Sequence, residues 1–160
     1  MLHIKPVNRC NTAEILALSV GNDQTAFVAS NQTSLDEAQT AISGGGHAFP
    51  FGIYEGDLPV GFLMIGYSTD EHWESPPVIA EGNYNLWRLM IDKRFQGNGY
   101  GKQALQLALN FIRQWPCGKA AYCWLSYYPK NSVAKSLYHS FGFLETEETD
   151  GDEIIAALKL

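Results

Sequence analysis

The chain has 160 residues, of which 46% are hydrophobic and 18% charged, a composition typical of one globular domain with its own core. No stretch of about 18 apolar residues occurs, and the N-terminus lacks the apolar core of a signal peptide, so neither a membrane span nor a secretory leader is expected. The three cysteines form no C-x-x-C pair, which argues against a disulfide framework or a zinc site and fits a reducing cytoplasm, and the net charge of −6 argues against nucleic acid as the main partner.

The first half of the chain predicts a strand, two helices and a hairpin. Thr12 is expected to cap the first helix, and Ser34 to open the second through a capping box with Glu37. Three glycines at 44–46 end the second helix. The elements expected up to residue 67 are a strand over 3–7, helices over 13–19 and 35–42, and strands over 49–54 and 60–67 joined by a turn at 55–59.

The second half predicts two strand–helix units followed by two strands. A polar loop covers residues 68–82, Pro116 stops one helix and Asn131 caps another. The expected elements are strands over 83–91 and 120–127, helices over 102–115 and 131–140, a strand starting at 141–144 and a last strand over 154–160. This order predicts an α/β (α+β) fold over residues 1–160, with a mixed central sheet of about seven strands and helices on both faces.

A glycine-rich turn, Gln96-Gly97-Asn98-Gly99-Tyr100-Gly101, lies between a predicted strand and a predicted helix. Glycines there allow a tight turn and close approach to a ligand, and the helix start directs N–H groups at one spot, which suits a phosphate or pyrophosphate. The spacing matches neither the dinucleotide pattern G-x-G-x-x-G nor a Walker loop. A surface turn without a ligand is the alternative.

Charge is unevenly distributed along the chain. Residues 88–135 carry eight bases and one acid, a net charge of +7, whereas the remaining residues carry −13. This pattern favours an anionic cofactor and a cationic substrate, and solvated surface is the alternative. Ten acids form two clusters that could border an acceptor cleft: Asp70, Glu71, Glu74 and Glu81, and Glu145, Glu147, Glu148, Asp150, Asp152 and Glu153.

A second motif begins at Asn131 and ends at Phe143. Ala134, Leu137, Tyr138 and Phe141 fall at i, i+3, i+4 and i+7 and form an apolar stripe, so on spacing alone Tyr138 is a core aromatic. The pattern Q-x-x-G-x-G followed by N-x-x-A-x-x-L-Y-x-x-x-G-F resembles the paired signature of GCN5-related N-acetyltransferases (GNAT), over essentially the whole chain. Residues 81–92 and the small size resemble the bacterial spermine/spermidine acetyltransferases of that superfamily.

The resemblance implies a binding site for acetyl-CoA, with no metal. It implies that Leu89, Met90 and Ile91 offer backbone groups to the pantetheine arm, and that Asn131 and Lys135 contact the cofactor. The pyrophosphate is expected on Gln96, Gly97, Asn98, Gly99, Tyr100, Gly101 and Lys102.

The resemblance also places Tyr138 as the general acid. Two departures are Lys93, where many members have proline, and the lack of a marked general base. Glu81 is one candidate base, and a water chain is the alternative.

The expected function is transfer of an acetyl group to a primary amine by direct attack, with the amine losing a proton and Tyr138 protonating the leaving thiolate. Cys117 and Cys123 are then packing residues. The expected acceptor is a small cationic amine, a polyamine such as spermine or spermidine; another small amine or a peptide N-terminus is an alternative, as is a non-catalytic acyl-CoA-binding protein. Neither nucleic acid nor a membrane is an expected partner, and a homodimer is left open.

Overall fold

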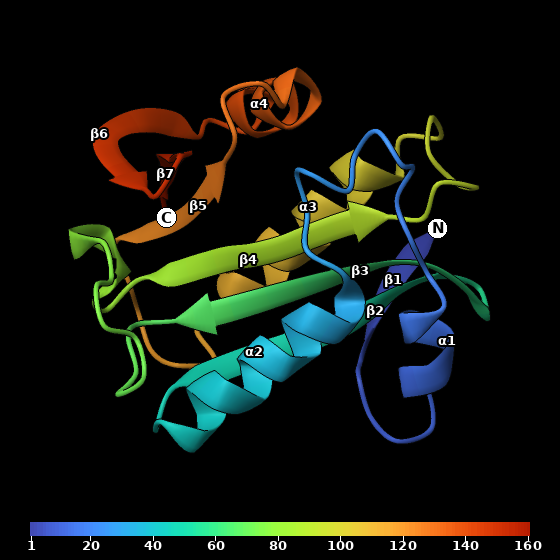
Figure 1. Cartoon of the computed structure of the whole chain (residues 1–160), viewed down its shortest axis with the longest axis horizontal. Helices are drawn as coiled ribbons and strands as arrows, with labels where there is room; N and C mark the ends of the chain where they lie inside the picture. Colours follow the sequence, from blue (N-terminus) through green and yellow to red (C-terminus); the bar gives the residue numbers. More distant parts are fainter.

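A seven-stranded mixed sheet runs through the protein in the order β1-β2-β3-β4-β5-β7-β6, and only β4 and β5 pair in parallel (Figure 1). The computed structural model describes residues 1–160. None of its helices has the length and apolar character needed to cross a membrane. The elements are β1 (Leu2–Pro6), α1 (Thr12–Leu16), α2 (Asn31–Ser43), β2 (His47–Glu55), β3 (Leu58–Tyr67), the 3-10 helix η1 (Val78–Ala80), β4 (Tyr84–Ile91), α3 (Tyr100–Ile112), β5 (Tyr122–Tyr127), α4 (Ser132–Ser140), β6 (Leu144–Asp150) and β7 (Glu153–Lys159).

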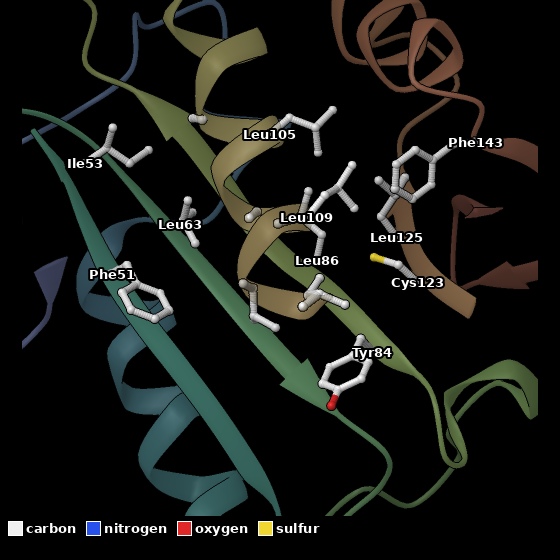
Figure 2. Close-up of a cluster of buried hydrophobic side chains, with 14 of the residues drawn as sticks. Phe51, Ile53, Leu63, Tyr84, Leu86, Leu105, Leu109, Cys123, Leu125 and Phe143 are labelled. Carbon is white, nitrogen blue, oxygen red and sulfur yellow. The ribbon is translucent and has the colours of Figure 1, made fainter. Parts of the chain in front are cut away.

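Helices cover both faces of the sheet, as the predicted element order implies. On one face α3 buries Leu105 and Leu109 against strand residues such as Leu63 and Leu86, and Figure 2 shows these side chains meeting. On the other face α1 and α2 pack on a second cluster that includes Ile15, Ala38, Phe62, Met64 and Met90. Successive strand residues point to opposite faces, so Phe62 and Leu63 enter different clusters.

The start of α2 differs from the prediction. The helix begins at Asn31, and the Ser30 hydroxyl accepts a hydrogen bond from the Thr33 N–H at 3.1 Å, so Ser30 is the N-cap. The predicted capping box of Ser34 and Glu37 is therefore wrong. Ser34 is fully buried inside the helix and donates its hydroxyl to the Ser30 carbonyl, while Glu37 binds an arginine of β4.

Other boundaries shift by a few residues for local reasons. The first helix runs from Thr12 to Leu16, and its N-cap position is Asn11, which makes no side-chain capping bond, so the predicted cap at Thr12 is wrong. Helix α3 starts at Tyr100 rather than 102 and ends at Ile112, and Trp115 beyond it has φ 58°. Strand β6 starts only at Leu144, because Gly142 has φ 96° and turns the chain first. Asn131 caps α4 as predicted, accepting from the Ala134 N–H at 3.3 Å.

Candidate active site

A cleft of about 810 Å³ opens where β4 and β5 separate. The two strands pair only at Tyr84 with Cys123 and at Asn85 with Trp124, and beyond these positions they diverge (Figure 1). The backbone edge of β4 from Leu86 onward therefore has no partner on the β5 side. The walls come from β4 and β5, from α2, from the loop at residues 25–29, from the start of α4 and from the β6–β7 hairpin.

A bulge in β4 directs two consecutive side chains to the α2 face of the sheet. Met64 pairs with Arg88 and Ile65 with Leu86, which leaves Trp87 as an additional residue in β4. Trp87 packs against the core below α1 and α2, and Arg88 donates to Glu37 of α2 at 2.8 Å. Bulges commonly re-aim side chains in this way, and here both residues line the cleft.

The glycine-rich loop before α3 presents unpaired backbone donors. Gly97 and Gly99 have φ 83° and 75°, values that favour glycine, and a Cβ at either would meet no neighbouring atom. None of the backbone N–H groups from Gln96 to Lys102 donates a hydrogen bond within the protein, and α3 has no side-chain N-cap. Unpaired N–H groups at the start of a 13-residue helix fit an anionic pyrophosphate.

Hydrogen bonds of the Gln96 side chain and of Lys93 position this loop without using its own backbone N–H groups. The Gln96 amide donates to the Ile91 carbonyl at 2.9 Å and exchanges hydrogen bonds with the Gln24 amide. The Lys93 N–H donates to the Ser19 carbonyl at 2.9 Å, a bond that a proline at this position could not make. The chain thus ties the end of β4 to the segment after α1.

A buried carboxylate also stabilises the contact between the end of β4 and the segment after α1. Asp92 accepts hydrogen bonds from the Ser19 N–H at 2.9 Å and from the Arg94 side chain at 2.8 Å. Burial by itself would raise the pKa of Asp92, but these hydrogen bonds and the Arg94 charge hold it below its ordinary value. Asp92 is therefore ionised at neutral pH and anchors the loop.

Tyr138 of α4 reaches the cleft with a free hydroxyl. Its ring packs against Tyr127 and Phe143, with ring centroids 6.1 and 5.9 Å apart, and its hydroxyl makes no hydrogen bond within the protein. Burial, followed by the Cys123 thiol and the Glu153 carboxyl, raises the pKa of Tyr138 to about 12. The phenol is protonated at neutral pH and can donate a proton to a group bound in the cleft.

Cys117 and Cys123 are unsuited to covalent chemistry. Cys123 is fully buried, and burial raises the pKa of its thiol to about 12. Burial also raises the pKa of Cys117. Both thiols are therefore protonated at neutral pH, and a thiol is a poor nucleophile compared with a thiolate.

The cleft is strongly acidic. Five carboxylates line it, and Arg88 is the one lysine or arginine among the lining residues. The guanidinium is bound to Glu37, but its Nε is buried without a partner, and the same holds for Nε1 of Trp124 on the opposite strand. The five carboxylates belong to Asp36, Glu37, Asp70, Asp150 and Glu153.

The acids of α2 were missed by sequence reasoning, although the sequence contains a signal for them. Thr33, Asp36, Glu37 and Thr40 recur at i, i+3, i+4 and i+7 and form a polar stripe, and all four line the cleft. Ten clustered acids were predicted from the sequence to border an acceptor cleft, and three of them line this cleft: Asp70, Asp150 and Glu153.

The structure brings some predicted site residues together and separates others. Leu89, Asn131 and Tyr138 line the cleft, while Met90 and Ile91 are buried at the end of β4. Lys135 does not line the cleft and forms an ion pair with Glu145 at 3.2 Å. Glu81 is exposed after η1 and also does not line the cleft, so the fold does not bring it to Tyr138.

Comparison with known proteins identifies the family of this chain from its sequence. A model of the acetyltransferase (GNAT) family matches residues 17–143. A spermine/spermidine N(1)-acetyltransferase of Bacillus subtilis is 35% identical over 151 residues, which cover 93% of this chain and 91% of that protein.

Solved structures share the fold at low sequence identity. An aminoglycoside acetyltransferase in complex with coenzyme A superposes with a TM-score of 0.76 at 11% identity, over 99% of this chain and 95% of that chain. A PaiA N-acetyltransferase from Thermoplasma acidophilum, also in complex with coenzyme A, superposes with a TM-score of 0.65 at 16% identity, over 100% and 99% of the two chains.

Proposed function

Since this chain belongs to the acetyltransferase (GNAT) family and is an acetyl-CoA-dependent amine N-acetyltransferase, we propose that its acceptor is a polyamine such as spermidine or spermine. The observation that carries the proposal is the charge of the cleft, where five carboxylates face a single guanidinium. The relative from Bacillus subtilis is named for the same class of acceptor.

The charge of the cleft favours several ammonium groups on one molecule. Two unit charges 4 Å apart attract by about 1 kcal/mol in water and about 4 kcal/mol near a protein surface. A polyamine can meet carboxylates along the cleft at more than one point, whereas a monoamine can meet them at one. Trp73 stacks on Trp124 in the cleft wall, with ring centroids 6.2 Å apart, and adds aromatic surface for cation–π contact.

We assign the reaction to the cleft, to the end of β4 and to the glycine-rich loop that follows it, in a direct transfer. The loop from Gln96 to Lys102 holds the pyrophosphate with its unpaired N–H groups. The N–H groups of Leu89 and Ile91, which point away from β3 on the open edge of β4, contact the pantetheine arm and stabilise the oxyanion that forms on amine attack. Tyr138 donates its proton to the leaving sulfur. No protein nucleophile takes part, because both thiols nearby are held protonated.

The proposal is tested by comparing spermidine with a monoamine of similar length in an assay of free-thiol release. We expect kcat/KM to be higher for spermidine, and the advantage to shrink between low and high salt, because salt screens the partly exposed charges. Equal values for the two amines without a salt-dependent difference, or a preference for a peptide N-terminus, would overturn the assignment.

A variant at the cleft wall tests whether the preference for spermidine depends on the cleft carboxylates. Asp70→Asn removes one lining carboxylate, and the exposed Asp152→Asn on the β6–β7 turn is the matched control. Exposed charge pairs contribute about 0.2–1 kcal/mol, so Asp70→Asn is expected to lower kcat/KM for spermidine by up to about fivefold and to leave the monoamine unchanged. An equal effect of the two variants would count against a role of the cleft charge.

A further inference from the structure

Glu153, the first residue of β7, is a carboxylate of the cleft for which the reaction above has no use. It is partly buried and lines the cleft near Ser126 of β5, which pairs with Ile155 in β7. It lies opposite Asp150 in the β6–β7 hairpin. Among the cleft carboxylates it is the one whose charge acts on Tyr138.

Glu153 and Tyr138 enter the cleft from opposite faces of the sheet. Ile155, two residues after Glu153 and hence on the same side of β7, packs with Trp124 and Ala80. The intervening Ile154 packs on the α3 side, against the same core as Leu137 of α4. Glu153 therefore comes from the face that carries α2 and its acids, whereas Tyr138 comes from the α3 and α4 side.

This arrangement separates the two proton transfers that the reaction needs. The pKa of an alkylammonium group is about 10.4, so at neutral pH the group must lose a proton before its nitrogen can attack. An acceptor bound to the acidic face would meet Glu153, whereas a leaving sulfur on the α4 side would meet Tyr138. A base on one side and an acid on the other suit attack and departure at one carbon.

We propose that Glu153 is the general base that takes the proton from the acceptor ammonium, an assignment that rests on the proposed function. Glu153 accepts the first N–H proton and passes it to water. The nitrogen lone pair then forms the C–N bond, the C–S bond breaks with its electron pair on sulfur, and sulfur takes the Tyr138 proton. The second N–H proton leaves through Glu153 to solvent, and solvent returns one proton to Tyr138, so each turnover releases one net proton to solvent.

The surroundings of Glu153 support this role. Burial and then Asp150 raise the pKa of Glu153, while Arg88 and the Ser126 hydroxyl act in the opposite direction. A raised pKa makes a carboxylate a stronger base. The groups that face Glu153 are thus Asp150 from β6, Arg88 from β4, Ser126 from β5 and Tyr138 from α4.

The other acids near the cleft are less suited. Glu37 is bound to Arg88 at 2.8 Å, and Asp70 accepts the His72 N–H at 2.8 Å. Glu145 is held by Tyr127 at 2.7 Å and by Lys135, and its pKa is lowered, first by the Tyr127 hydrogen bond. Glu153 forms no ion pair, and its pKa is raised, first by burial.

The test is the pH profile of Glu153→Gln, with the exposed Glu147→Gln of the same hairpin as the matched control. We expect Glu153→Gln to lower kcat/KM about 100-fold at pH 7, the scale for a positioned base, with unchanged affinity for coenzyme A by calorimetry. The loss should shrink as pH rises toward the amine's own pKa, because solvent then supplies neutral amine. Glu147→Gln should match the wild type throughout.

Two outcomes would overturn the assignment. A variant with kcat/KM within twofold of the wild type and the same pH profile would show that Glu153 takes no proton. A raised KM for the amine with unchanged kcat and profile would make Glu153 a binding residue only. If Glu153→Gln does not fold, Glu153→Asp decides the question: a lower kcat with the wild-type pH profile supports the role, and an unchanged kcat contradicts it.

The measurement is separable from the acceptor assignment. The pH profile is taken with whichever amine the wild type acetylates fastest. Failure of spermidine as the preferred acceptor would then leave the test of Glu153 intact, and failure of Glu153 would leave the preference for polyamines intact.

Discussion

Replacing Tyr138 by phenylalanine removes one oxygen atom from the cleft and little else. The ring contacts with Tyr127 and Phe143 remain, and the hydroxyl has no hydrogen-bond partner in the protein to lose. We therefore expect the free energy of unfolding to change by less than about 0.5 kcal/mol. Loss of a positioned acid is expected to lower kcat by about 100-fold, which corresponds to about 2.7 kcal/mol of transition-state stabilisation.

The changes in kcat and in the free energy of unfolding are measured on the same preparation, together with the affinity for coenzyme A. Turnover is followed by free-thiol release at saturating acetyl-CoA and spermidine, coenzyme A affinity by calorimetry, and stability by urea unfolding. Tyr122→Phe is the matched control, because Tyr122 at the start of β5 is 40% exposed and does not line the cleft. It should leave kcat, affinity and stability unchanged.

Two results would refute the reasoning on Tyr138. A kcat within about twofold of the wild type, when the chemical step limits turnover, would make Tyr138 a packing residue of the apolar stripe. A large loss of kcat together with weaker coenzyme A binding and several kcal/mol of lost stability would show that the ring, rather than the proton, is what matters.

Two glycines provide further tests. Gly99→Asp puts a negative charge where the pyrophosphate is expected, and at φ 75° it also strains the backbone, so coenzyme A affinity by calorimetry should fall at least tenfold; Gly56→Asp, at φ 60° in the β2–β3 turn, should retain it, and equal affinities would contradict the loop assignment. Gly61→Ala would press a Cβ against the Met90 carbonyl oxygen and should cost about 1–3 kcal/mol in urea unfolding. Gly66→Ala in the same strand, with its nearest atom at 3.4 Å, should cost less, and the reverse order would be evidence against this close approach of β3 and β4.

Local features of the sequence were sufficient for the element order and for the glycine-rich turn between β4 and α3. Positive φ at Gly97 and Gly99 depends on those residues alone, and the cap at Asn131 depends on one side chain and an N–H three residues away. The motif around Tyr138 likewise follows from helical spacing. The interacting residues of such signals lie within a few positions of each other in the chain, so they can be recognised from the sequence.

The acceptor side of the cleft was decided by tertiary structure. Glu81 was the candidate base from the sequence, yet Glu153 enters the cleft, since β7 inserts between β5 and β6. Arg88 reaches Glu37 only because the bulge turns it to the α2 face, and that bulge depends on the register between β3 and β4. Strand register and the separation of β4 from β5 arise from pairing between distant segments, and no local pattern of residues encodes which of many acids that pairing brings together.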